Sequence, residues 1–286
     1  MHNIYVLMYT ILTAGAENAA RRTFVRENAM ILTIDVGNTN IVLALFADDG
    51  GISAVSRIST DRGRMSDEYA VLLRNIALLH GAELSCVTGA IISSVVPPLT
   101  NQLKKAIMTV FGVNALIVGP GLKTGLNIRI DDPSQLGSDL ACGAVAAINK
   151  YPTPCVIVDL GTATKFTALG KNGVFLGGAI LPGVNISLDA LSQGAAQLPH
   201  ISLDGEPKSV IGTNTVDCMR SGVIYGTASM IDGMLDRFRE ELGGDLTVVA
   251  TGGLAGDIIP HCRSSMILDS DLLLEGLRIL YLKNAK

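Results

Sequence analysis

One short pattern occurs twice in this chain of 286 residues and constrains its fold more than any other feature. A strand-like run ends in an aspartate, a glycine follows two positions later, and small hydroxyl or amide side chains come next. Residues 34–40 read IDVGNTN and residues 158–164 read VDLGTAT. Runs rich in β-branched residues flank both copies, so each copy predicts two strands joined by a tight turn. The repetition predicts two halves that are built alike.

Turns of this composition are suited to holding anions. Glycine permits close approach and positive φ, so backbone N–H groups can converge on a phosphate, and the aspartate can hold the water shell of a cation. The sequence contains no G-x-x-x-x-G-K-[ST] loop, so a phosphate chain would have to be bound by the paired turns. A single Asp-x-Gly turn is weak evidence, because ordinary turns often contain it. Two copies in matching contexts predict a nucleotide site.

Charge and composition argue against several other kinds of protein. Lysine and arginine number 22 against 26 aspartates and glutamates, and no basic block occurs, so we expect no nucleic-acid partner. The cysteines are scattered without a C-x-x-C pair, which is typical of reduced core thiols in a cytosolic protein. The histidines are dispersed, so a zinc site has little support. The residues concerned are Cys86, Cys142, Cys155, Cys218 and Cys262, and His2, His80, His200 and His261.

The first 29 residues precede the first predicted strand, which begins at Met30. Residues 4–13 are apolar, but no lysine or arginine precedes them, as a secretory signal would require, and the run is too short to span a bilayer. We therefore expect an upstream extension that contributes nothing to the site, and no membrane partner. A signal peptide is the alternative.

Hydrophobic spacing alternates between strand and helix along the rest of the chain. Further strands are predicted at residues 41–47, 52–59, 87–96, 114–118, 155–159, 163–169, 174–181 and 246–250. Helices are predicted at residues 66–80, with Ser66 as the N-cap, and at 99–111, 137–150, 214–242 and 271–281. This alternation predicts an α/β fold of mainly parallel sheets covered on both faces.

The most probable linker by composition is the YPTP segment at residues 151–154. It divides the chain into the extension, residues 1–29, an N-terminal domain, residues 30–150, and a C-terminal domain, residues 151–286. We expect a nucleotide cleft between the two domains, with Asp35 and Asp159 on opposite sides of it.

The two turns resemble the phosphate hairpins of the actin, hexokinase and heat-shock ATPase superfamily, whose duplicated ribonuclease H-like domains hold ATP. A closer resemblance rests on a set of segments rather than on any one of them. In order, residues 30–40 (MILTIDVGNTN), 92–97 (ISSVVP), 132–139 (DPSQLGSD), 159–164 (DLGTAT), 177–183 (GGAILPG), 251–253 (TGG) and 274–277 (LEGL) resemble the pattern of type III pantothenate kinases. The resemblance spans residues 30–284 and implies ATP-dependent phosphorylation of pantothenate to 4′-phosphopantothenate, the first step of coenzyme A synthesis.

The resemblance also implies roles for the two turns. The first would bind ATP through Asp35, Val36, Gly37, Asn38, Thr39, Asn40, Ile41 and Val42, and the second through Gly161, Thr162 and Thr164. Mg²⁺ would arrive with ATP and be held through water by Asp35, since Mg²⁺ prefers carboxylates and water. Asp159 would hold a monovalent cation, K⁺ or NH₄⁺. The structural alternative for Thr162 and Thr164 is stabilisation of a β-hairpin.

Asp139 is the candidate general base, which would accept the proton of the pantothenate hydroxyl. Because it lies at the start of a predicted helix, the alternative is that Ser138 or Asp139 only caps that helix. The resemblance places Gly137, Ser138, Asp139, Leu140, Gly178 and Thr215 around pantothenate.

Position 140 departs from the family pattern, which usually has an arginine after the aspartate. That arginine would pair with the pantothenate carboxylate, and Leu140 cannot do so. An aromatic residue of the family is also replaced, by Ile130. Arg129 or Lys123 compensates, or backbone N–H groups meet the carboxylate, or pantothenate binds poorly.

The predicted helix at residues 214–242 carries an apolar stripe that is typical of a core face. Similar kinases form homodimers through this region, so the resemblance implies a homodimer. Two rival functions remain: a non-enzymatic ATP-binding regulator on the same fold, which Leu140 suggests, and a kinase for another small acceptor.

Overall fold

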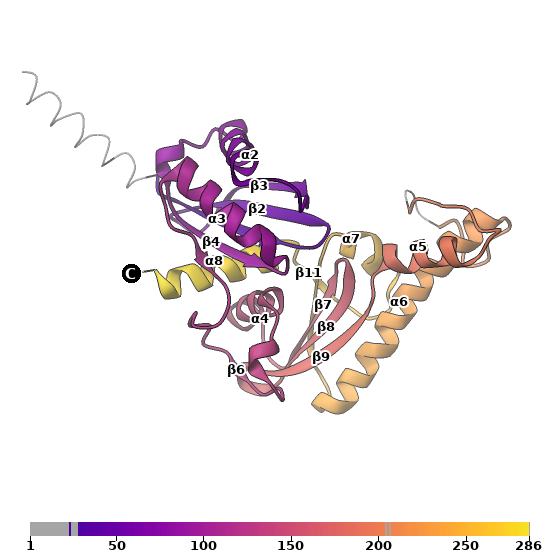
Figure 1. The fold of residues 1–286 in the computed structure, drawn as a ribbon. Coiled ribbons are helices and arrows are strands. Elements are labelled where there is room, and N and C mark those ends of the chain that lie inside the picture. Colours follow the sequence, from indigo (N-terminus) through magenta and orange to yellow (C-terminus); the bar gives the residue numbers. More distant parts are fainter. Residues whose placement is uncertain (1–22, 24–27, 204, 206, 286) are drawn as a thin grey trace, which may run out of the picture. The chain divides into compact units, whose positions relative to one another are not determined.

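The computed structural model describes residues 23, 28–203, 205 and 207–285, and the described residues form two compact units that divide after Val118 (Figure 1). The predicted extension, residues 1–29, lies almost wholly outside the described residues. This division falls earlier than the linker at residues 151–154 that the sequence suggested, because the helix before that linker packs within the second unit.

The first unit is built on a mixed sheet of five strands in the order β3-β2-β1-β4-β5. The strands are β1 (Met30–Val36), β2 (Asn40–Ala47), β3 (Ile52–Ser59), β4 (Val87–Ser94) and β5 (Leu116–Ile117). β1, β2 and β3 pair antiparallel, whereas β4 is parallel to β1 and β5 is parallel to β4. Every second residue of β3 is exposed, as expected for a strand at a sheet edge.

Two helices, α2 (Ser66–Leu79) and α3 (Pro97–Phe111), cover one face of this sheet. Their buried leucines and alanines pack on alternate residues of β1, β2 and β4 in a single apolar core. Pro97 and Pro98 open α3, because proline at the first helical positions gives up no hydrogen bond. Met65, not Ser66, is the N-cap of α2.

The second unit contains a sheet of six strands in the order β11-β10-β7-β8-β9-β6. They are β6 (Asn127–Ile128), β7 (Cys155–Leu160), β8 (Ala163–Leu169), β9 (Val174–Pro182), β10 (Thr247–Thr251) and β11 (Ile267–Leu268). β7, β8 and β9 are antiparallel neighbours, whereas β10 is parallel to β7 and β11 to β10. β6 adds a parallel edge beside β9.

Helices cover both faces of this second sheet (Figure 1). α4 (Ser138–Lys150) and α8 (Leu272–Asn284) pack against each other and share a core with one face. α5 (Val184–Gly194), α6 (Thr215–Leu242) and α7 (Ala255–Ile258) belong to the core of the other face. Short 3₁₀ turns complete the chain at Leu84–Cys86, Pro133–Gln135, Lys171–Gly173 and Ile259–His261.

The two sheets repeat one topology. The order β9-β8-β7-β10-β11 matches β3-β2-β1-β4-β5 strand for strand, with the same parallel and antiparallel pairings. The predicted duplication is therefore confirmed. Both sheets combine parallel pairs with the antiparallel strands that each repeated turn joins, so the expectation of mainly parallel sheets holds only in part.

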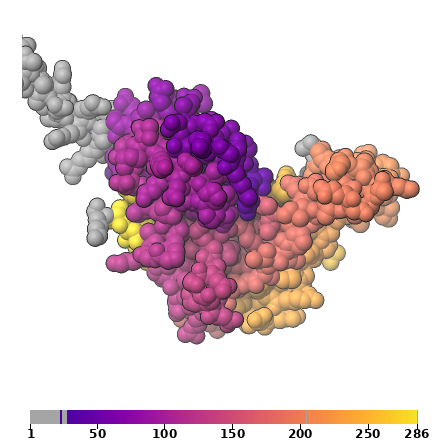
Figure 2. All heavy atoms as spheres, viewed as in Figure 1, coloured from indigo at the N-terminus to yellow at the C-terminus, as the bar shows by residue number. Residues whose placement is uncertain are grey.

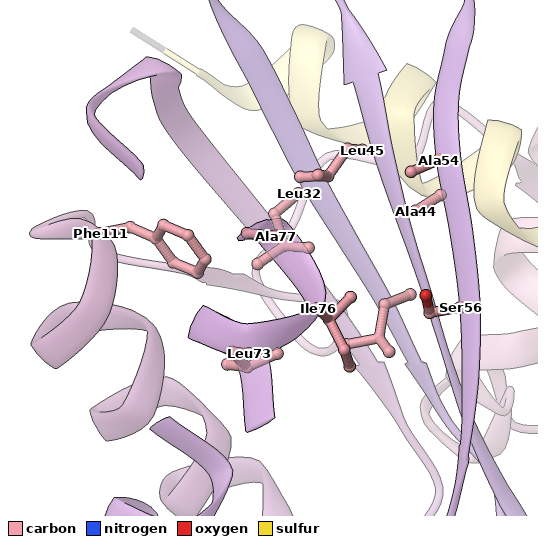
Figure 3. Close-up of a pocket in the computed structure, with 10 residues that line it drawn as sticks. Leu32, Ala44, Leu45, Ala54, Ser56, Leu73, Ile76, Ala77 and Phe111 are labelled. Carbon is pink, nitrogen blue, oxygen red and sulfur yellow. The ribbon is translucent and has the colours of Figure 1, made fainter. Parts of the chain in front are cut away.

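The first unit holds a small apolar cavity of about 10 Å³ between its sheet and α2 (Figure 3). Leu32, Leu45, Leu73 and Ile76 are among the residues that line it. A volume of this size is about that of one water molecule, and Ser56 is the lining residue with a polar side chain. The cavity is therefore a feature of core packing and no substrate site.

Candidate active site

The first turn joins β1 to β2 and has the geometry that its sequence predicted. The Gly37 N–H donates to the Asn40 carbonyl at 2.9 Å, which closes the turn, and Asn38 and Thr39 are exposed at its tip. Asp35 lies beside Ser93 of β4, and the Val95 N–H donates to the Val36 carbonyl at 3.0 Å. The turn and the ISSVVP segment thus meet at one end of the sheet.

The segment after β3 braces this turn, and sequence reasoning missed it. The Thr60 hydroxyl donates to the Gly37 carbonyl at 2.7 Å, and the Thr60 N–H donates to the Thr39 carbonyl at 2.9 Å. The Arg62 guanidinium donates to the Asn38 side chain at 2.9 Å. Arg62 therefore brings a positive charge to the tip of the turn. Only the register of the β2–β3 pair, which places the end of β3 beside the start of β2, could have revealed this contact.

The second turn joins β7 to β8. Leu160 pairs with Thr164, which leaves Gly161, Thr162 and Ala163 as the turn. Thr162 is exposed at the tip, but Thr164 is fully buried and its hydroxyl has no hydrogen-bond partner among the described residues. The structure therefore presents Thr162 and Gly161 at the turn and places Thr164 inside the sheet.

Two of the predicted carboxylates meet at a lysine that the sequence analysis did not consider. The Lys165 Nζ lies 2.6 Å from Asp139 Oδ2 and 2.8 Å from Asp159 Oδ2. The three side chains are mostly buried, with exposed fractions of 17%, 17% and 14% for Lys165, Asp139 and Asp159. Burial acts to lower the pKa of Lys165, but the two carboxylates outweigh it and raise the pKa above its usual value. The ammonium thus stays charged.

Secondary structure fixes each member of this cluster. Asp159 and Lys165 face each other across the β7–β8 pair, whereas Asp139 stands in the first turn of α4, where a negative charge is favoured by the helix dipole. Gly137 occupies the N-cap position of α4 and Ser138 is its first helical residue. The alternative that Ser138 or Asp139 is the N-cap is therefore wrong.

Glycines allow two further segments to approach the second turn closely. Gly252 has a φ of +98°, and a Cβ there would lie 2.7 Å from Asp159 Oδ1 and 2.6 Å from the Leu160 carbonyl carbon. Gly183, the N-cap of α5, would place a Cβ 2.0 Å from the Thr162 carbonyl oxygen. The TGG and GGAILPG segments therefore form the walls of the second turn.

The remaining predicted substrate residues are more dispersed. Leu140 packs against the apolar cluster between the sheet and α4. Gly178 lies on β9, where a Cβ would be 1.8 Å from the Phe166 carbonyl oxygen, so close packing already requires glycine. Thr215 is the exposed first residue of α6, and the Asn214 side chain caps that helix by accepting from the Asp217 N–H.

Lys123 and Arg129, suggested as substitutes for the missing arginine, are exposed, and contacts of their backbones hold them in place. The Lys123 N–H donates to the Asn284 side chain at 2.9 Å, and the Arg129 N–H donates to the Phe175 carbonyl at 2.8 Å. The cation that contacts Asp139 is Lys165. Its ammonium is already shared by two carboxylates, so the cluster carries a net charge of about −1.

Taken together, the site residues can hold anionic groups and accept a proton. Both turns expose small polar side chains at the end of a β-hairpin, and a buried carboxylate stands beside the second turn. In the described residues, no group of three or more His, Cys, Asp or Glu side chains is arranged to hold a metal ion. No described helix is both long and apolar enough to cross a bilayer.

Solved structures with this fold define its class. The chain aligns with the ethanolamine utilization protein EutJ of Carboxydothermus hydrogenoformans at a TM-score of 0.53 and 14% identity, covering 87% of this chain and 89% of that one. It aligns equally well, with a TM-score of 0.53 and 14% identity, with a putative 2-dehydro-3-deoxygalactonokinase of Sinorhizobium meliloti, covering 89% and 97%. The duplicated sheets are those of the actin-like ATPase and sugar kinase fold.

Sequence relatives narrow this class to one family. The family profile of type III pantothenate kinases matches residues 31–237. The type III pantothenate kinase of Moorella thermoacetica is 44% identical over 255 residues, covering 89% of this chain and all of the relative, and that of Exiguobacterium sp. is 45% identical over 257 residues, covering 90% and 100%. The chain belongs to the type III pantothenate kinase family.

Proposed function

We propose that this chain transfers the γ-phosphoryl group of ATP to pantothenate and so makes 4′-phosphopantothenate, the first step of coenzyme A synthesis. Family membership over most of the chain supports the reaction. The observation that carries the proposal is the Asp139 carboxylate, held beside the second phosphate turn by Lys165. A kinase of this fold uses ATP together with a divalent metal ion.

The residues suggest a division of labour. Phosphoryl transfer needs cradled phosphates and a base near the attacking hydroxyl. The first turn supplies backbone donors and Asn38 and Thr39, with Arg62 beside them. The second supplies Gly161 and Thr162, and the start of α5 at Gly183 adds the positive end of a helix dipole.

Asp139 accepts the proton of the pantothenate hydroxyl in this proposal. The Lys165 ammonium, 2.6 Å from Oδ2, holds this carboxylate in place beside the second turn. Gly137, Ser138, Leu140, Gly178 and Thr215 remain proposed contacts of pantothenate.

Asp35 fits the proposed Mg²⁺ role. It is partly exposed near the end of β1, one residue pair away from the turn, and a carboxylate that acts through water matches the preference of Mg²⁺. When bound with ATP, the ion would offset charge on the phosphates.

A K⁺ or NH₄⁺ ion at Asp159 fits less well. The Lys165 ammonium lies 2.8 Å from Oδ2, and Oδ1 lies close to Gly252. A monovalent cation would have to displace a buried ammonium from one of the oxygens that would bind it. The proposed reaction therefore uses no such ion.

The direct test combines purified protein with ATP, Mg²⁺ and pantothenate and detects phosphopantothenate by mass spectrometry. Asp139→Asn should lower turnover by more than about 100-fold and leave ATP affinity nearly unchanged, because the base acts on the acceptor. Asp245→Asn is the matched control, since Asp245 is exposed and precedes the start of β10, the end of that strand that lies away from the second turn. Equal loss of ATP binding and transfer would show that Asp139 is structural.

The same assay separates the rival functions. ATP binding without any product would favour a regulator, and ADP release with another acceptor in place of pantothenate would reveal a different kinase. The prediction that one nucleotide engages both turns is tested with Arg62→Ala and Thr162→Ala, each of which should weaken ATP binding. An unchanged ATP affinity in either variant would contradict it.

We also propose a homodimer through α5 and α6. A groove of about 560 Å³ lies between them and the end of β9, lined by Leu181, Leu191, Met219, Val223 and Met230. Apolar residues nearby are exposed, namely Ile180, Ile186, Leu191 and Val216. α5 and the start of α6 project from the second unit as an arm in Figure 1 and Figure 2. A second copy of the chain would cover this surface.

Sedimentation should give twice the chain mass of 29.9 kDa for the unaltered protein. Leu191→Asp should yield monomers, whereas Leu79→Asp, on the exposed side of α2, should not. A monomeric unaltered protein would exclude the dimer.

A cytoplasmic location is proposed from the use of ATP and from the five free cysteines. The sequence predicted that all five are core residues, but Cys218 is exposed and Cys262 is half-buried.

A further inference from the structure

The Asp139–Lys165–Asp159 cluster differs from an ordinary salt bridge, because one buried ammonium serves two carboxylates from different elements. Asp139 comes from α4, and Asp159 and Lys165 from neighbouring strands. Both contacts are of hydrogen-bond length, 2.6 and 2.8 Å. Without the ammonium, two mostly buried carboxylates would lie close together with no cation between them, which is electrostatically unfavourable.

The pairing of the sheet fixes the direction in which the Lys165 side chain points. It is paired directly with Asp159 across β7 and β8 and follows Thr164, which is fully buried. Its side chain is 17% exposed, so water screens the charges only weakly. The position that the sequence analysis gave to a free cation at Asp159 is thus taken by a side chain.

We propose that Lys165 is a positioning residue that acts as a tethered counterion: its ammonium lies between the Asp139 and Asp159 carboxylates, offsets their like charges and makes an added monovalent cation at Asp159 unnecessary. The role rests on the proposed function only where activity is measured. The proposal predicts that K⁺ does not change the rate of the unaltered protein and that K⁺ restores the rate of a variant that lacks the ammonium.

The unaltered protein should phosphorylate pantothenate at rates that agree within about twofold in K⁺, NH₄⁺, Na⁺ and choline buffers of equal ionic strength. Lys165→Met keeps a long side chain and removes its charge. Its rate should be more than about 100-fold lower than that of the unaltered protein in choline buffer. K⁺ or NH₄⁺ should raise that rate at least about tenfold, and the rate should saturate with cation concentration. Lys171→Met, at an exposed lysine, is the matched control and should behave as the unaltered protein.

Thermal unfolding gives a readout that does not need the kinase reaction. In choline buffer Lys165→Met should unfold about 5–10 °C lower, because removing one partner leaves buried charges of like sign. K⁺ or NH₄⁺ should raise that temperature in the variant and leave the unaltered protein unchanged. If the protein does not phosphorylate pantothenate, the predicted differences in rate disappear, but K⁺ or NH₄⁺ should still raise the unfolding temperature of the variant.

A second variant guards against simple misfolding. Asp159→Asn combined with Lys165→Met restores the cluster to a net charge of about −1, so the double variant should unfold at a higher temperature than Lys165→Met and should lose the response to K⁺. A strong K⁺ requirement of the unaltered protein would overturn the proposal. So would a Lys165→Met protein that is fully active and stable in choline.

Discussion

Single residues set the shape of the second turn, and Gly252 is the most restricted of them. It combines a left-handed backbone conformation with a close approach to Asp159 and Leu160. An L-residue there would be strained, and its Cβ would press against the carboxylate that Lys165 holds. The TGG segment was noticed in the sequence as part of a resemblance, but its contact with Asp159 could not be read from it.

Gly252→Ala should destabilise the protein by about 2 kcal/mol or more, because it adds backbone strain to a steric clash. Denaturant unfolding measures the effect. Gly256→Ala is the control, since a Cβ there meets nothing within 4 Å. The argument fails if the two variants unfold alike.

Arg62 offers a second residue-scale prediction. Its guanidinium donates to Asn38 at the exposed tip of the first turn, where ATP phosphates are proposed to bind. Arg62→Ala should weaken ATP binding by about 3- to 10-fold, since an exposed cation contributes modestly to holding an anion. Calorimetric titration with ATP gives the affinity, and Arg57→Ala on β3 is the comparison. Equal affinities would remove Arg62 from the site.

At the scale of elements, the spacing of apolar residues located nearly every long strand and helix. The strands at residues 52–59 and 163–169 begin and end where predicted, and α6 begins one residue after Asn214, its N-cap. The sequence did not predict α7, β6 and β11, which have too few residues to show a period, nor α5, although it is 11 residues long. The turns themselves predicted the hairpins β1–β2 and β7–β8, whereas the antiparallel pairing of β3 with β2 and of β9 with β8 was not predicted.

The packing of α2 on the first sheet can be tested directly. Leu73 is 2% exposed and lines the small cavity in Figure 3, so Leu73→Ala would enlarge an existing gap. A loss of about 2–5 kcal/mol in the free energy of unfolding is expected. Leu79→Ala, at a leucine that is 83% exposed on the same helix, should cost less than about 0.5 kcal/mol. Equal losses would contradict the assigned core face.

For the whole molecule, the sequence predicted the duplication and the family, because both are carried by local motifs. It could not predict the meeting of Asp139 with Lys165, since those residues come from elements joined only by the fold. Nor did it show that Thr164 is buried, because one residue decides on which side of a strand a side chain lies. Charged partners and facing directions were therefore the parts that required a structure.

A second charged cluster ties the C-terminal helix into the second unit and should make stability depend on alkaline pH. Asp269 accepts from the Tyr151 hydroxyl at 2.7 Å and pairs with Lys150 at 2.6 Å. Burial, together with the hydrogen bond to Asp269, raises the pKa of Tyr151 to about 12. The neutral phenol is thus favoured in the folded protein, so its contribution is complete below pH 10 and is lost as pH rises toward 12.

Tyr151→Phe should lower the free energy of unfolding by about 1 kcal/mol at pH 7, the net value of such a hydrogen bond. The difference from the unaltered protein should shrink between pH 10 and 12. Urea unfolding across that range measures it, with Tyr281→Phe on α8 as the control. A difference that grows with pH would reverse the assigned direction of the shift.

Lys165 has one more consequence. A dissolved ion occupies its site only in proportion to its supply, whereas a side chain on a strand remains at the same effective concentration whatever the medium contains. The reaction would therefore proceed equally well in organisms or compartments whose salts differ widely. In exchange, the chain would lose any means of sensing those salts through this site.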